Sequence, residues 1–117
     1  MRIYVAAPYS KGETAMNVRN AILAGDKLLE MGHMPFIPHL THFWHYISPK
    51  PWEVWLKIDQ DWLTVCDALL RLPGESKGAD LEVEMAQKMC LLIYYSLDEI
   101  PKGIDVYNWT EIKPKVS

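Results

Sequence analysis

Two kinds of hydrophobic pattern alternate along the chain: short continuous apolar runs and longer stretches with helical spacing. The apolar runs are typical of strands and lie at 2–6, 34–38, 67–72 and 90–95. The stretches with helical spacing lie at 14–31, 52–65 and 79–89. Thr14 is suited to cap the first of these predicted helices, and Gly32 is suited to end it.

Alternating strands and helices predict an open, parallel α/β sheet with right-handed crossovers. We expect a single domain over 1–117, with four to five strands flanked by helices in a flavodoxin-like or Rossmann-like arrangement, and with the fifth strand at 104–109. Two prolines in the 34–38 strand place it at an edge of the sheet. The polar tail at 110–117 is expected to be mobile unless a partner subunit orders it.

Three loops follow predicted strands, at 7–12, 39–51 and 73–78. Ligands of open parallel sheets bind beyond the carboxyl ends of the strands, so these loops are the expected surroundings of a binding site. The 39–51 segment is predicted to be a long aromatic and histidine-rich loop with room for one helical turn. A short turn or helix is expected at 97–102.

Composition narrows the class of partner. Half of the 117 residues are hydrophobic, and the net charge is −3 without a basic block, which argues against a nucleic-acid polymer but leaves small anions open. The chain has no apolar run of about 18 residues and no signal peptide, so we expect a cytoplasmic protein without a membrane partner. Cys66 and Cys90 lie in apolar contexts and are expected to be buried and reduced.

Two acidic residues fall on apolar helix faces. Glu82 lies in the apolar stripe of its predicted helix, whereas Asp80 and Glu84 lie on the opposite stripe. Asp59 lies in the apolar stripe of the preceding helix. An inward carboxylate needs a partner or a purpose, so the two together indicate a site. The alternative is that each is a buried acid satisfied by the backbone or by an arginine.

The 73–78 loop precedes a helix and is a candidate anion cradle, in which backbone N–H groups and the Ser76 hydroxyl would bind a phosphate. Its spacing is not that of a Walker A loop, and no GxGxxG follows the first strand, so an ordinary strand-to-helix turn is the alternative. Ser10 and Lys11 are candidates to contact a phosphate or carboxylate, or are simply surface residues. Asp67 is interpreted as structural.

His39, His42 and His45 are spaced by three residues in the 39–51 segment. A metal site would need them on one helical face, so we expect no metal, and we consider a substrate-facing role or simple packing instead. Trp44 and its aromatic neighbours could stack on a flat base or form a subunit interface. Five Trp and six Tyr are many for this length, which favours some lining a pocket or an interface.

The chain resembles the nucleoside 2-deoxyribosyltransferase family and its relatives, the 2'-deoxynucleoside 5'-phosphate N-hydrolases, over roughly residues 2–95. The pieces that carry the resemblance are Ile3-Tyr4-Val5-Ala6-Ala7-Pro8, Asp59 placed eight residues before Asp67, and Ser76-x-Gly78-x-x-x-Glu82-x-x-x-Ala86. Their order and spacing together, rather than any single piece, make the resemblance specific.

The resemblance implies a role for each matching residue. Glu82 would be the nucleophile that attacks the anomeric carbon, and Asp59 would help to protonate the departing base. Tyr4 would position the nucleophile, and Gly78 would let the loop approach the substrate. The chemistry agrees, because cleavage through an oxocarbenium-like state needs a carboxylate beneath the sugar and an acid at the leaving group. No metal and no organic cofactor is implied.

Ser76 departs from the transferases, which usually carry Asp six residues before the nucleophile, and matches the phosphate-recognising hydrolases. This favours a nucleoside 5'-monophosphate as substrate and water as acceptor. Ala7-Pro8, however, is like the transferases, and the Ser10-Lys11 loop lacks the hydrolases' arginine, so transfer to another base stays open. Ala7, Pro8, Ser10, Lys11, Ser76, Gly78, His42 and Trp44 are the expected substrate-binding residues.

Two other classes of function compete with an enzyme that cleaves N-glycosidic bonds. One is a nucleotide-binding or sensing domain without turnover, and the other is a homo-oligomeric scaffold. A pure binding domain has no use for an inward, unpaired carboxylate beneath the sugar, so Glu82 discriminates between binding and catalysis. The family resemblance also implies a homodimer or a higher homo-oligomer with shared active sites.

Overall fold

A computed structural model describes residues 1–104 of the chain. Its elements are, in chain order, β1 (Arg2–Ala6), α1 (Thr14–Glu30), β2 (Met34–Phe36), η1 (Pro38–Thr41), α2 (His42–Ile47), α3 (Trp52–Leu63), β3 (Ala68–Arg71), α4 (Lys77–Lys88), β4 (Leu92–Tyr94) and η2 (Leu97–Glu99). The predicted tail at 110–117, and the predicted fifth strand beyond Ile104, lie outside the described residues.

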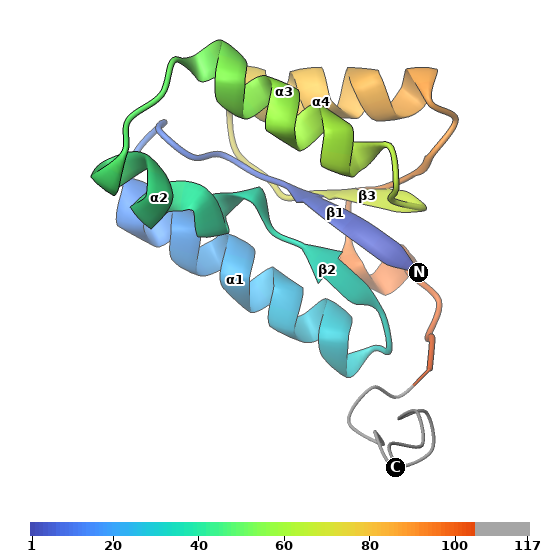
Figure 1. Cartoon of the computed structure of the whole chain (residues 1–117). Helices are drawn as coiled ribbons and strands as arrows, with labels where there is room; N and C mark the ends of the chain where they lie inside the picture. Colours follow the sequence, from blue (N-terminus) through green and yellow to red (C-terminus); the bar gives the residue numbers. More distant parts are fainter. Residues whose placement is uncertain (105–117) are drawn as a thin grey trace, which may run out of the picture.

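The strands form one parallel sheet in the order β2-β1-β3-β4 (Figure 1). The predicted α/β class and the edge position of the 34–38 strand are therefore confirmed. Tyr4, at the centre of β1, is in register with Phe36 of β2 and with Leu69 of β3. The first crossover places β2 on one side of β1, and the second crossover places β3 on the other side. The boundary between β1 and β3 is therefore the topological switch point of the sheet.

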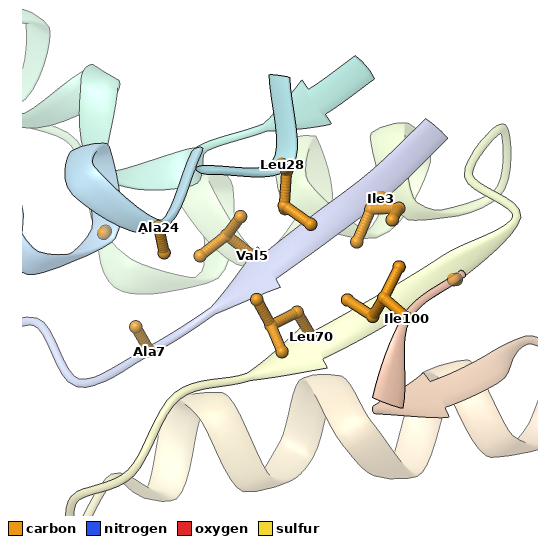
Figure 2. Close-up of a cluster of buried hydrophobic side chains, with 9 residues drawn as sticks. Ile3, Val5, Ala7, Ala24, Leu28, Leu70 and Ile100 are labelled. Atoms are coloured by element: carbon orange, nitrogen blue, oxygen red, sulfur yellow. The ribbon is translucent and has the colours of Figure 1, made fainter. Parts of the chain in front are cut away.

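Helices cover both faces of the sheet: α1 lies on one face, while α3 and α4 lie on the other (Figure 1). Because side chains alternate along a strand, β1 contributes to two separate cores. Figure 2 shows the core on the α1 face, where Ile3, Val5 and Leu70 meet Leu28 and Ile100. The core on the other face contains the side chains of Tyr4, Ala6, Leu63, Cys66, Leu69, Ala79 and Ala86.

Two predictions about the first helix have different outcomes. Gly32 follows the helix with a φ of +89°, and the N–H of His33 returns to the carbonyl of Leu28, so the predicted glycine stop is confirmed. Thr14 as the cap is wrong, because Glu13 occupies the N-cap position and Thr14 is already helical. Over residues 1–104, no helix is both long and apolar enough to cross a bilayer.

The 39–51 segment contains more structure than the predicted loop. The 3-10 turn η1 leads into α2, a helix without a single buried residue. Three apolar or aromatic side chains of the helix, Phe43, Tyr46 and Ile47, are more than two-thirds exposed. The sequence spacing does not predict this helix because none of its residues packs into the core, which removes the periodic signal.

Cys66 is buried and Cys90 is exposed, and both thiols are free. The expectation of reduced cysteines is confirmed, and that of a buried Cys90 is wrong. Cys90 follows α4 in the left-handed region, with a φ of 61°, so it ends the helix instead of beginning a buried strand. The strand β4 starts only at Leu92, on the second edge of the sheet.

Candidate active site

Glu82 lies in the middle of α4 and faces the sheet, with only 8% of the residue exposed. The helix places it there because Ala79, Glu82 and Ala86 share one face, and the two alanines allow α4 to lie close to β1 and β3. Directly beneath, the hydroxyl of the fully buried Tyr4 donates a hydrogen bond to Oε2 of Glu82. The predicted inward carboxylate is therefore observed, and it is paired with a neutral donor.

Burial raises the pKa of the Glu82 carboxyl to about 8. The hydrogen bond from Tyr4 and the positive charge of Arg71 act in the opposite direction, while the negative charge of Asp59 adds to the increase. Burial, followed by the charge of Glu82, also raises the pKa of the Tyr4 hydroxyl well above its usual value, so Tyr4 remains a proton donor in this contact. The carboxyl is thus poised to gain or lose its proton near neutral pH.

Asp59 approaches the same region from α3. Its Oδ1 is buried and accepts no hydrogen bond from any residue within 1–104. Burial raises the pKa of this carboxyl to about 6, and its charge influences both Glu82 and Tyr4. A buried carboxylate oxygen without a donor is costly for the protein alone. The alternative that an arginine or the backbone satisfies each acid therefore does not hold for Asp59 in the described chain.

Two aromatic side chains beside these acids were not predicted to belong to the site. Phe36 contacts Tyr4, with ring centroids 5.4 Å apart, and stacks on Trp62 at 5.3 Å. Trp62 follows Asp59 by three residues on α3 and is about half exposed. The sequence contains features that could have identified both residues. Trp62 shares the helical stripe of Asp59, and Phe36 lies in a strand expected to adjoin β1. Together they form an apolar wall beside the two carboxyls.

Arg71 was also missed, because it sits within the apolar run of 67–72 that predicts a buried strand. It is 9% exposed and ends β3 on the α4 side of the sheet, where its guanidinium donates to Asp80 Oδ1 at 2.9 Å. The sequence feature that could have identified Arg71 is its position as a single cation inside a run of apolar residues. Its charge acts on the carboxyl of Glu82.

Ser76 and Gly78 lie at the amino end of α4, as the sequence predicts. Ser76 caps the helix, since its Oγ accepts a hydrogen bond from the N–H of Ala79 at 3.0 Å. Its hydroxyl hydrogen is therefore available for another acceptor. A Cβ at Gly78 would meet only Ser76 Oγ, at 3.9 Å, so packing within the protein does not require glycine at this position.

The first loop lies mainly on the α1 side of the sheet. Ala7 is part of the core on that face, and Ala7 and Pro8 line a pocket of about 360 Å³ between α1 and the 72–73 segment. Ser10 is exposed, and the Nζ of Lys11 lies 3.6 Å from a carboxylate oxygen of Glu75 in an exposed ion pair. None of these four residues forms a hydrogen bond or ion pair with Glu82 in the described structure, and their substrate-binding role remains a prediction.

The three histidines each have a different partner. The Nε2–H of His39 donates to the Pro8 carbonyl at 2.8 Å, His42 Nδ1 pairs with the Tyr9 hydroxyl at 2.6 Å, and His45 Nδ1 accepts from the indole of Trp55 at 2.7 Å. Among residues 1–104, no group of three potential ligands could hold a metal ion.

Trp44, which was predicted to bind substrate, lies edge-on to Trp55, with ring centroids 5.0 Å apart, and is half exposed. The ammonium of Lys50 lies 5.6 Å from the Trp44 ring centroid. The stretch around α2 is thus held by aromatic and cation–π contacts of its own. The described interactions of Trp44 and His42 are with Trp55, Lys50, Tyr9 and Phe43, and their substrate-binding role too remains a prediction.

Comparison with solved structures places the fold among 2-deoxyribosyltransferases. The 2-deoxyribosyltransferase from the psychrotolerant bacterium Bacillus psychrosaccharolyticus aligns with a TM-score of 0.60 and 16% identity, over 80% of this chain and 69% of that one. The 2-desoxiribosyltransferase from Leishmania mexicana aligns with a TM-score of 0.55 and 19% identity, over 79% and 61% of the respective chains. At such identities the similarity establishes a shared fold.

The search among curated proteins finds no match to this sequence. A family model does match, over residues 1–96, and it is described as a domain of unknown function, DUF7768. The match covers β1 through β4, and with them Tyr4, Asp59 and Glu82. The chain therefore belongs to the DUF7768 family.

Proposed function

We propose that the protein cleaves the N-glycosidic bond of a 2'-deoxynucleoside, a nucleoside or the corresponding 5'-monophosphate, through a covalent glycosyl ester on Glu82. The observation that carries the proposal is the arrangement of Tyr4, Glu82 and Asp59: a buried carboxyl held by a phenol, beside a second carboxyl with an oxygen that has no hydrogen-bond partner among residues 1–104. The fold shared with 2-deoxyribosyltransferases supports the same chemistry.

In the first step, the ionised Glu82 attacks the anomeric carbon through an oxocarbenium-like state, and the bond between that carbon and the base nitrogen breaks. The electron pair of this bond stays with the base, which takes the proton of Asp59. In the second step, the ionised Asp59 accepts a proton from water, which attacks the anomeric carbon and releases Glu82. A second base in place of that water would give transfer. Tyr4 holds Oε2, which leaves Oε1 to form the ester.

The protonation of the two acids sets the expected pH dependence. The reaction needs Glu82 ionised and Asp59 protonated, whereas the pKa of about 8 for Glu82 and of about 6 for Asp59 places the shared proton mainly on Glu82. The active arrangement is then a minority form of the singly protonated pair, and it is most populated between these two values.

We therefore expect kcat/KM for base release to follow a bell-shaped pH profile with limbs near pH 6 and pH 8. Chromatography of free base between pH 4.5 and about 9.5, in buffers of constant ionic strength, measures it. A flat profile across this range would show that neither carboxyl takes part.

Ser76 supports a 5'-monophosphate as the substrate and water as the acceptor. Its hydroxyl retains a free hydrogen at the amino end of a helix, where N–H groups and the helix dipole favour an anion. Lys77 begins the same helix and is the nearest cation in sequence, while Lys11 is engaged by Glu75. Base release measured with and without an acceptor base separates hydrolysis from transfer.

We further propose that the protein is a homo-oligomer that uses the α2 surface. Phe43, Tyr46, Ile47 and Trp52 lie close together in the sequence and are exposed by 58% to 81%, and exposed large apolar side chains that gather in one region mark interaction sites. Sedimentation velocity at micromolar concentration is expected to show a dimer or a larger species, and Ile47→Glu is expected to shift it toward monomer. A wild-type monomer at this concentration would refute the proposal.

A further inference from the structure

The buried guanidinium of Arg71 has three acceptors: two lie in the connection between β3 and α4, and the third lies in the first turn of α4. Its Nη1 donates to the carbonyl of Leu72, and its Nη2 donates to the carbonyl of Gly74 at 2.9 Å and to Asp80 at 2.9 Å. A buried cation is costly unless its donors are satisfied, so the loop must keep these carbonyls turned inward. The arginine thereby fixes the path of the backbone from β3 to α4.

The loop is restrained from its other side as well. Gly74 has a φ of +118°, and a Cβ at this position would lie 2.8 Å from the Pro8 ring. The turn therefore packs against the first loop in a conformation that favours glycine. Two residues later Ser76 caps α4, and Asp80 in the first turn of that helix returns to Arg71. The contacts of Arg71 thus span the segment that sets where α4 begins.

We propose that Arg71 is a positioning residue for Glu82: it fixes the β3–α4 loop and the first turn of α4, and so holds Glu82 in place above Tyr4. Its charge acts on the same carboxyl from within the sheet. The inference rests on the proposed function only for its kinetic consequence, because the placement of Glu82 can be measured without any reaction. Its buried position in β3 and its contacts with the loop distinguish Arg71 from the exposed lysines of the described residues.

Several neighbouring groups set the electrostatic environment of the Glu82 carboxyl. The groups that face Glu82 are Tyr4 from β1, Asp59 from α3 and Arg71 from β3, and Cys66 acts on Tyr4 from the same core. Of these, Arg71 is the cation, and it lowers the pKa of Glu82. Removal of the Arg71 charge should therefore raise the pKa of Glu82 further. Loss of the hydrogen bonds to Leu72, Gly74 and Asp80, with the charge retained, should not.

Three variants separate position from charge. Arg71→Lys keeps the charge but cannot form the bidentate set of bonds to the loop and Asp80. Arg71→Gln loses both. Glu84→Gln is the matched control, because Glu84 lies on the same helix in an exposed pair with Lys88 and is not one of the acceptors of Arg71. Circular dichroism and thermal unfolding establish that each variant is folded.

The experiment is a carbon-13 NMR titration of the Glu82 carboxyl, combined with amide hydrogen exchange of the first turns of α4 and with base-release kinetics. We expect Arg71→Gln to raise the Glu82 pKa, to speed exchange in these turns at least tenfold, and to lower kcat by about 10- to 100-fold. Arg71→Lys should speed exchange and lower kcat with little change in the titration. Glu84→Gln should stay within about threefold of wild type in kcat.

Unchanged exchange in Arg71→Lys and in Arg71→Gln would overturn the proposal, and so would full recovery of kcat by lysine. If Arg71→Gln does not fold, Arg71→Lys alone still tests the positioning role, because it retains the charge and removes the set of hydrogen bonds that the guanidinium makes to the loop and Asp80. If the wild-type protein releases no base, the proposed function fails, while the titration and the exchange measurement still test the positioning role of Arg71.

Discussion

Replacement of Glu82 by glutamine is expected to abolish base release, with a loss on the order of 10³-fold or more, while the fold survives. Glutamine has the same shape, and its amide oxygen can accept the hydrogen bond from Tyr4. It cannot form an ester with the anomeric carbon. Chromatographic base release under single-turnover conditions measures the loss. Glu84→Gln is the matched control, because Glu84 lies on the same helix in an exposed pair with Lys88 and should leave the rate unchanged.

The same substitution has a second readout in stability. The folded-state pKa of Glu82 is about 8, above the value of roughly 4.3 for an unfolded chain. Between these values the native state binds more protons, so this group makes the wild-type protein less stable as the pH rises, and its effect levels off above pH 8. Glu82→Gln should therefore gain stability relative to wild type as the pH rises from 5 to 9, by a few kcal/mol at most.

Thermal unfolding of both proteins at pH 5 and pH 9 measures this difference. A Glu82→Gln protein that loses stability equally at both pH values would show that the carboxyl is ionised and well satisfied in the native state. A Glu82→Gln enzyme that releases base at the wild-type rate would contradict the proposed mechanism outright.

Replacement of Asp59 by asparagine is expected to lower kcat by about 10²- to 10⁴-fold, the range that general acid catalysis usually contributes. The reason is that the buried Oδ1 of Asp59 accepts no hydrogen bond from the described part of the chain, so a proton on this carboxyl is free to be passed to a leaving base. The pH profile should also change from a bell to a single rise toward alkaline pH, because only the ionisation of Glu82 then remains.

The control for Asp59 is Asp61→Asn. Asp61 lies two residues further along α3, but it is 68% exposed and pairs with Lys57 on the surface. Asp61→Asn should keep both the wild-type rate and the bell-shaped pH profile. Substrates with good and poor leaving bases sharpen the test, since the loss in Asp59→Asn should be largest for the poorest leaving base. An equal loss for all bases would show that Asp59 does not protonate them.

The sheet and its helices were predictable because their signals are local. The apolar runs and helical stripes locate β1, β3, α1, α3 and α4 to within a few residues, and two prolines place β2 at an edge. The inward orientation of Glu82 and Asp59 followed from helical periodicity alone. Periodicity fails for α2, which buries nothing, and for Cys90, whose exposure results from a left-handed residue at a helix end.

The contacts within the candidate site were less predictable, because they depend on register and on loop path. That Tyr4 meets Phe36 requires the pairing of β1 with β2, and that Arg71 turns back to Gly74 and Asp80 requires the turn itself. A single cation in an apolar run marks a position worth attention, but it does not say which carbonyls it holds. Nor does the spacing of the histidines show that His42 pairs with the Tyr9 hydroxyl.

The most direct test of the account is chromatography of free base released from a panel of ribo- and deoxynucleosides and their 5'-monophosphates, with and without an acceptor base. Wild type and Glu84→Gln should release base from at least one substrate, faster from a 5'-monophosphate than from its nucleoside, and without need of an acceptor base. Glu82→Gln should release none. No release by a folded wild-type protein from any substrate, or equal release by Glu82→Gln, would contradict the account and favour a nucleotide-binding domain without turnover.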